Sequence, residues 1–203
     1  MSERGTIHII DDDESLRFSL RSLFRASGLQ ASDYASVGDF LKAPMPTGPT
    51  CLLLDVRLPG MNGLDFQARL ADHGIRSPVV IMTGHGDIPM SVRGMKAGAV
   101  DFLTKPFREQ DMLDAVTAAL DRDRSRLSLE AADAELRERY ATLSPREQQV
   151  MRLVTAGMMN KQVANALKLS EVTVKIHRGS AMHKMAARSL ADLVKMAEAL
   201  GLS

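Results

Sequence analysis

Short apolar runs in the first part of the chain alternate with stretches in which apolar residues recur every three or four positions. Four runs have the length of strands: residues 7–10, 51–54, 79–82 and 101–103. Four stretches have helical spacing: residues 16–24, 63–73, 88–98 and 109–120. Strands that alternate with helices in this way predict an α/β fold with a parallel sheet.

From residue 121 to residue 140 the chain is charged and contains neither Gly nor Pro. A narrow apolar stripe persists, formed by Leu129, Ala132, Leu136 and Tyr140. This composition predicts a helical linker that can continue the preceding helix. A solvated helix and a short coiled coil both remain open.

The remaining residues carry the start and stop signals of short helices. Ser144, Pro145 and Glu147 have the spacing of a capped helix start, and Gly157 ends that helix. Three more helices are expected to open at Asn160, Ser170 and Ser189. The expected division is therefore residues 1–120, a linker at 121–140 and an all-helical domain at 141–203.

Charge is distributed unevenly over these 203 residues. Residues 1–120 hold 12 Lys and Arg against 15 Asp and Glu, whereas residues 141–203 hold 9 against 4. A small basic domain suits a nucleic acid partner.

A single cysteine excludes an intramolecular disulfide. No apolar run reaches about 18 residues, so no membrane span is expected. With no secretory signal at its polar start, the chain is expected to be cytoplasmic.

Polar residues stand just past each predicted strand. They are Asp11, Asp12 and Asp13, then Asp55, then Thr83, then Lys105. The carboxyl ends of parallel strands meet at one edge of a sheet, so these groups are expected to lie together. Carboxylates can hold Mg²⁺ or Mn²⁺, and a carboxylate can also attack a phosphoryl group. A single such residue is usually a helix cap or a turn, and Asp13 is expected to be a cap. The occurrence of all four polar signals at successive strand ends favours a site that binds a phosphoryl group.

Residues 6–120 resemble the receiver domain of two-component response regulators, most clearly in the segment 54–63. The resemblance implies a doubly wound, five-stranded parallel sheet with five helices, and a sensor histidine kinase as phosphoryl donor. It implies that Asp55 is the phosphoacceptor, Thr83 the switch hydroxyl and Lys105 the lysine of the site, followed by a peptide bond that is often cis. Phe102 matches the switch aromatic. The implied metal ligands are Asp12, Asp55 and the backbone carbonyl of Arg57, with Asp11 acting indirectly.

Residues 171–185 have the two faces of a helix that enters a major groove. Val174, Ala181 and Met185 lie on one face, and Lys175, Ile176 and Gly179 lie on another. Four residues could neutralise phosphates: Lys161, Lys175, Arg178 and Lys184. A solvated basic face would produce the same spacing.

Residues 143–200 resemble a LuxR-type helix-turn-helix domain, as found in FixJ-like regulators. The matching residues include 143–147, Gly157, 160–161 and 170–178. The resemblance implies DNA contacts from Asn160, Lys161, Thr173, Lys175, Ile176, His177 and Arg178. Gly179 departs from some relatives that carry a long basic residue at this position, so base readout is expected to depend more on Lys175 and Ile176, with Arg178 as a further candidate.

We therefore interpret the chain as a DNA-binding transcription regulator that is switched by phosphorylation and is not itself an enzyme, apart from slow loss of its phosphoryl group. Phosphorylation is expected to favour a homodimer that binds the major groove of double-stranded DNA, with RNA polymerase as a further partner. Two alternatives remain: an Mg²⁺-dependent phosphatase with an Asp nucleophile, and a regulator whose tail binds RNA or protein. Against the phosphatase, the chain has no substrate-binding insertion. Against an RNA-binding or protein-binding tail, the groove-facing pattern of residues 171–185 would be unexplained.

Overall fold

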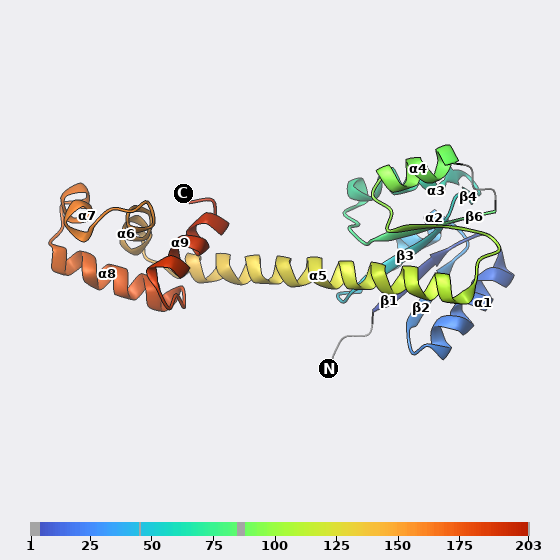
Figure 1. Ribbon diagram of the computed structural model, residues 1–203, viewed down its shortest axis with the longest axis horizontal. Coiled ribbons are helices and arrows are strands. Elements are labelled where there is room, and N and C mark those ends of the chain that lie inside the picture. The colour runs from blue at the N-terminus through green and yellow to red at the C-terminus, as the bar shows by residue number, and fades with distance from the viewer. Residues whose placement is uncertain (1–4, 45, 85–87, 203) are drawn as a thin grey trace. The chain divides into compact units, whose positions relative to one another are not determined.

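A computed structural model describes residues 5–44, 46–84 and 88–202 (Figure 1). The chain forms two compact units, Met1–Leu127 and Ser128–Ser203. The boundary falls inside the predicted linker, and the three-part division of the sequence stays a prediction. Within the described residues, no helix is both long and apolar enough to cross a membrane.

The N-terminal unit is built on a parallel sheet with the strand order β2-β1-β3-β6-β7. Its strands are β1 (Thr6–Ile10), β2 (Gln30–Tyr34), β3 (Thr50–Asp55), β6 (Val79–Thr83) and β7 (Asp101–Thr104). Asp55 is in register with Met82, and Thr83 is in register with Thr104. The carboxyl ends of the central strands therefore align at one edge, which confirms the predicted five-stranded parallel sheet.

Helices cover both faces of this sheet (Figure 1). α1 (Glu14–Ala26) and the first part of α5 (Glu109–Ala141) pack on one face, around Ile9 and Leu53. The other face, which carries Ile10 and Leu54, is covered by α2 (Val37–Lys42), α3 (Gly63–Ala68) and α4 (Ile88–Lys96). Neighbouring strand residues point to opposite faces, so each central strand contributes to both cores.

Three elements differ from the sequence-based expectation. The helix expected over 63–73 is α3 followed by a 3₁₀ turn at Leu70–His73. The edge strand β2 has no apolar run, because it is exposed along one side. After β3, the short strands β4 (Arg57–Leu58) and β5 (Met61–Asn62) pair antiparallel. α5 continues without a break to Ala141, as the absence of Gly and Pro permits.

The C-terminal unit is helical, and the last turns of α5 contribute Leu136 and Tyr140 to its core. Its other helices are α6 (Pro145–Thr155), α7 (Asn160–Leu167), α8 (Glu171–Lys184) and α9 (Leu190–Ala199). Ser144 forms the predicted capping box with Glu147, and Ser170 and Ser189 cap α8 and α9. Gly157 ends the first of these helices at φ 88°, a conformation that glycine adopts readily.

Candidate functional site

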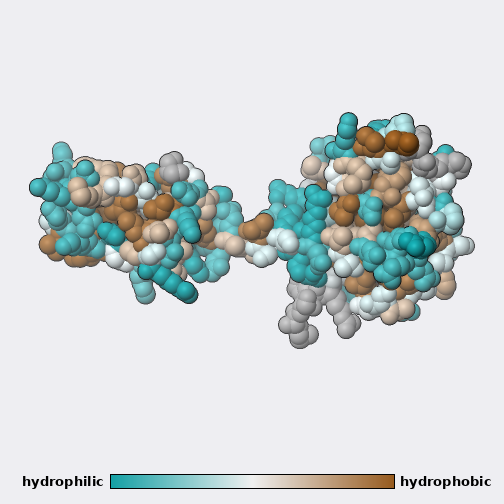
Figure 2. Space-filling model, viewed as in Figure 1, coloured by the Kyte–Doolittle hydropathy of each residue, from teal (hydrophilic) through white to brown (hydrophobic). Residues whose placement is uncertain are grey.

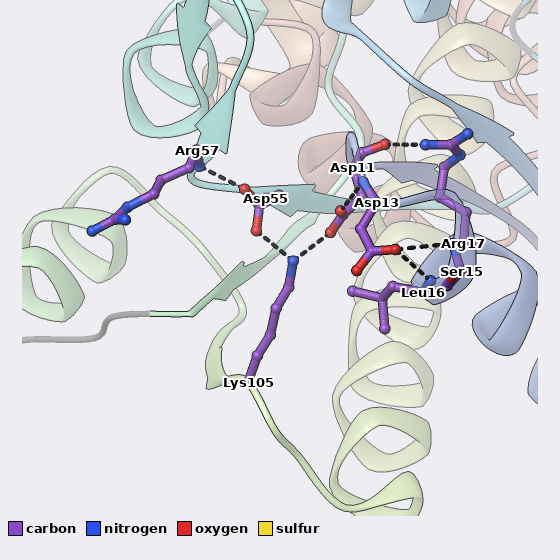
Figure 3. Close-up of polar contacts among 8 residues, drawn as sticks. All are labelled: Asp11, Asp13, Ser15, Leu16, Arg17, Asp55, Arg57 and Lys105. Carbon is purple, nitrogen blue, oxygen red and sulfur yellow. Dashed lines mark hydrogen bonds and ion pairs between the residues drawn. The ribbon is translucent and has the colours of Figure 1, made fainter.

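Three of the predicted polar residues meet in an ion pair network at the carboxyl edge of the sheet (Figure 3). Asp11 follows β1, Asp55 ends β3 and Lys105 follows β7. The Nζ atom of Lys105 lies 2.6 Å from Oδ2 of Asp11 and 2.6 Å from Oδ1 of Asp55. One ammonium group therefore bridges two carboxylates from adjacent strands. The peptide bond from Lys105 to Pro106 is cis, as the resemblance to receiver domains implies.

Burial and charge act in opposite directions in this network. Burial raises the pKa of Asp11, which is fully enclosed, and this effect outweighs hydrogen bonds from Lys105 and from the backbone N–H of Asp13. Burial alone would lower the pKa of Lys105, but its hydrogen bonds to Asp11 and Asp55 outweigh that effect, so the pKa is raised. Lys105 therefore stays cationic at neutral pH and provides a fixed positive charge.

The loop after Asp55 fixes the orientation of its carboxylate. The backbone N–H of Arg57 donates to Oδ2 of Asp55 over 2.6 Å, while the Arg57 side chain is exposed. The chain turns at Gly60, where φ is 79°, and returns to begin α3 at Gly63. A β-carbon on Gly63 would overlap the backbone of Asp55. The sequence analysis missed this role, although the dipeptides Pro59-Gly60 and Asn62-Gly63 are turn signals.

The two acids after Asp11 have different surroundings. Oδ1 of Asp13 accepts from the backbone N–H groups of Ser15 and Leu16, at 2.9 and 3.1 Å. This confirms Asp13 as the cap of α1. Asp12 is exposed at the start of the same loop, where its carboxylate can be reached from solvent.

The oxygen donors at this edge fit a hard divalent cation. Asp11, Asp12 and Asp55 offer carboxylates, and Arg57 offers a backbone carbonyl. In residues 5–44, 46–84 and 88–202, no three His, Cys, Asp or Glu side chains converge as a closed metal site. Mg²⁺ needs only one or two carboxylates, because water and phosphate oxygens complete its shell. Receiver domains generally bind Mg²⁺ at this place, and the residues present here suit it.

Thr83 and Phe102 both lie against α4. Thr83 is 1% exposed, and its hydroxyl donates to the sulfur of Met90 on α4 over 3.9 Å. Phe102 is half-buried on β7 and packs against the same core as Met90. Its ring lies 3.4 Å from the position of a β-carbon on Gly94 of α4. A movement of either side chain would therefore change how α4 packs against the sheet.

The second candidate site is α8 in the C-terminal unit. Val174, Ala181 and Met185 are completely buried, as the sequence pattern predicts. On the opposite side Lys175 is exposed, and Ile176 is 65% exposed. The structure therefore separates a core face from a solvent face along this helix.

The other predicted DNA contacts surround that exposed face. Lys161 is exposed on α7. Arg178 donates to the side-chain oxygen Oδ1 of Asn160 over 3.5 Å, which connects α7 with α8. Thr173 and His177 are half-buried, and the Thr173 hydroxyl lies 2.8 Å from that of Ser170 at the helix cap.

The sequence analysis identified Glu147 only as part of a helix cap and missed its contacts with α8. Glu147 is 6% exposed and accepts from the backbone of Ser144, from the Ser180 hydroxyl and from Lys184 Nζ at 2.7 Å. Hydrogen bonds from Lys184 and then Ser180 lower the pKa of Glu147 to about 2. Lys184 therefore connects α8 with the start of α6, and its contact with a phosphate stays a prediction.

Comparisons with known proteins assign a family to each of the two parts of the chain. Residues 7–117 match the response regulator receiver domain, and residues 141–197 match the bacterial regulatory proteins of the luxR family. Response regulators with LuxR-type DNA-binding domains are generally not enzymes. Nodulation protein W from Bradyrhizobium diazoefficiens is 54% identical over 202 residues, which cover 100% of this chain and 89% of that protein.

Two further relatives span both units. The transcriptional regulatory protein FixJ from Azorhizobium caulinodans is 41% identical, over 100% of this chain and 96% of its own length. The solved structure of the response regulator StyR is 44% identical, with a TM-score of 0.85 over 96% of this chain and 98% of that one. The chain therefore belongs to the two-component response regulators that carry a receiver domain and a LuxR-type DNA-binding domain.

Proposed function

We propose that Asp55 is the residue that accepts a phosphoryl group from a sensor histidine kinase. The observation that carries this proposal is the position of Lys105, which lies between Asp11 and Asp55 at 2.6 Å from each. An oxygen of Asp55 attacks the phosphorus atom, and the bond from phosphorus to the donor imidazole breaks as the new P–O bond forms. Lys105 then neutralises charge on the transferred group, and positioning supplies most of the catalysis.

Asp12, Asp55 and the Arg57 carbonyl are the groups that we propose to hold Mg²⁺ or Mn²⁺, with Asp11 acting through water. The bound cation supplies charge neutralisation for the phosphoryl oxygens. Asp12 is exposed and so is free to become a direct ligand, whereas Asp11 is buried against Lys105.

Phosphorylation is proposed to act on α4 through Thr83 and Phe102. The Thr83 hydroxyl would exchange the Met90 sulfur for a phosphoryl oxygen, a stronger acceptor. Met90 and Phe102 share one core, so the loss of that contact repacks α4 against the sheet.

A homodimer through α4 is the proposed result. Ile88, Val92 and Met95 are 80%, 45% and 46% exposed, and their spacing places them on one side of the helix. Figure 2 shows apolar surface over α4. Two phosphorylated receivers would bury this surface and bring two copies of α8 to two half-sites of duplex DNA, where RNA polymerase is the expected further partner. DNA as the ligand makes the cytoplasm the proposed compartment.

Incubation with acetyl phosphate and Mg²⁺, followed by mapping of the labelled peptide, tests the phosphoacceptor. The Asp55→Asn variant should lose the label. Asp65→Asn is the matched control, since Asp65 is an exposed acid on α3 that pairs with Arg93. Full labelling of Asp55→Asn at its usual site would contradict the assignment.

A further inference from the structure

A cleft of about 660 Å³ lies beside the first residue of β6, at the edge of the sheet opposite Asp55. Its walls come from α3, the 3₁₀ turn after it, the turn that follows α4, and α5. Clefts of this size commonly bind small molecules. No residue assigned above to phosphoryl transfer or DNA binding lines it.

The lining combines apolar side chains with positive charge. Leu70, Ile75 and Val79 provide apolar surface, while Arg122 and Arg126 of α5 stand at the rim. A third arginine contributes, and no Asp or Glu occurs among the described lining residues. Arg126 pairs with Asp123, whereas Arg122 has no ion pair in the described part of the chain. The cleft therefore suits a ligand with an apolar body and a negative charge.

Gln67 adds a third requirement. It is 6% exposed, and its Nε2 donates to the backbone carbonyl of Gly94 over 3.1 Å. A carbonyl can only accept, so this bond fixes which end of the amide is Oε1. That oxygen is buried and has no hydrogen-bond partner among the described residues. Gln67 lines the cleft, so a ligand N–H or O–H would satisfy this oxygen once the amide turns towards the cleft, and buried acceptors are rarely left unpaired.

We propose that this cleft binds a small amphipathic carboxylate that also carries a hydrogen-bond donor. The apolar body rests on Leu70, Ile75 and Val79, the donor reaches Gln67, and the carboxylate faces Arg122. A molecule in this position connects α5 with α3 and α4 and stabilises the N-terminal unit. The proposal does not depend on phosphoryl transfer, because Asp55 lies at the other edge of the sheet.

N-benzoylglycine is a suitable probe, since it has an aryl body, an amide N–H and a carboxylate. Titrated into the full-length ¹⁵N-labelled protein, it should shift the signals of the Gln67 side-chain amide, Gly98 and the Arg122 Nε–H. N-benzoylglycinamide lacks the charge and 4-phenylbutanoate lacks the N–H, so both should bind more weakly. Saturating probe should also raise the unfolding temperature.

Arg122→Gln should weaken binding about three- to fivefold, as expected for a solvent-exposed ion pair. Arg124→Gln is the matched control, since Arg124 lies on the same helix and pairs with Asp121 outside the cleft. Gln67→Leu should also weaken binding while retaining the fold. Equal affinity in Arg122→Gln and Arg124→Gln, or no shift at the cleft at millimolar probe, would overturn the proposal. Acetyl phosphate labelling of the same samples reports on Asp55 separately.

Discussion

A β-carbon on Gly63 would lie 2.1 Å from the backbone carbonyl oxygen of Asp55. The N–H of Gly63 also donates to the carbonyl of Val56 over 2.9 Å. The first residue of α3 is therefore in direct contact with the backbone of the proposed phosphoacceptor. Any side chain at position 63 must displace either the helix or the backbone that carries the Asp55 carboxylate.

Gly63→Ala is accordingly predicted to slow labelling of Asp55 by acetyl phosphate at least tenfold. The overlap should also destabilise the N-terminal unit by about 1–3 kcal/mol, as overpacking generally does. Gly38→Ala is the control, because a β-carbon there would meet only the Ser36 hydroxyl at 3.7 Å. Labelling rates and urea unfolding of both variants test this, and unchanged labelling in Gly63→Ala would contradict it.

Asp123→Ala is predicted to destabilise the N-terminal unit by roughly 2–4 kcal/mol, since it leaves buried donors unpaired. Asp123 is 1% exposed, accepts from the backbone N–H of Thr50 over 2.8 Å and pairs with Arg126. Asp121→Ala, at an exposed ion pair on the same helix, should cost little. Equilibrium unfolding followed by circular dichroism compares the two, and equal losses would refute the structural role of Asp123.

The stability of the C-terminal unit is predicted to fall in acid because of Glu147. Folding lowers the pKa of this carboxyl from 4.5 to about 2, so its contribution is complete above about pH 4.5. That contribution is lost as the pH falls towards 2. The difference in stability between wild type and Glu147→Gln should shrink as the pH falls across this range. Glu198→Gln, at an exposed acid on α9, serves as the control, and a difference independent of pH would contradict the prediction.

Lys175 and Lys161 are predicted to contact DNA in different ways. Lys175 lies on the exposed face of α8, the helix whose first turns reach base edges in this motif. Lys161 lies on α7, the helix that crosses the DNA backbone in this motif. Lys175→Ala should cost roughly 1–3 kcal/mol and relax specificity at one position, whereas Lys161→Ala should weaken all sequences alike. Selection on randomised duplexes distinguishes these outcomes. An unchanged sequence preference in Lys175→Ala would exclude base readout.

Val92→Asp is predicted to prevent the phosphorylation-dependent dimer. Val92 stands between Ile88 and Met95 on the exposed side of α4, where a charge would remain unpaired in an apolar interface. Phe18→Asp, at an apolar residue of α1 that is 63% exposed, provides the matched control. Sedimentation with and without beryllofluoride gives the result, and a dimer of Val92→Asp as tight as wild type would exclude this surface.

The sequence predicted most of the fold because its strands are apolar on both faces and its helices carry clear caps. The α/β class, the sheet and the caps at Asp13, Ser144, Ser170 and Ser189 are confirmed. β2 and the β4–β5 pair were not predicted from their own residues. Their formation depends on neighbours distant in sequence and on turn geometry, which hydrophobic periodicity does not record.

In the candidate sites too, some residues could be predicted from the sequence and others could not. Asp11, Asp55 and Lys105 were expected to meet because the ends of parallel strands converge, and the structure brings them together. Glu147 looked like a helix cap only, because its contact with Lys184 joins residues 37 positions apart. Nothing in the sequence distinguishes Gln67 and Asp123 from exposed polar residues of a helix. Their importance follows from their burial in the folded unit.

The contact between Thr50 and Asp123 bears on how regulators of this kind can exchange their domains. The receiver match ends at residue 117, yet the carboxylate that holds the first residue of β3 comes six positions later. A junction placed at 117 would take a foreign residue at 123 and leave the Thr50 N–H without its acceptor. A junction after Leu127, where the compact unit ends, carries the contact along. Recombination that respects this point should yield folded hybrids more often than recombination at the end of the match.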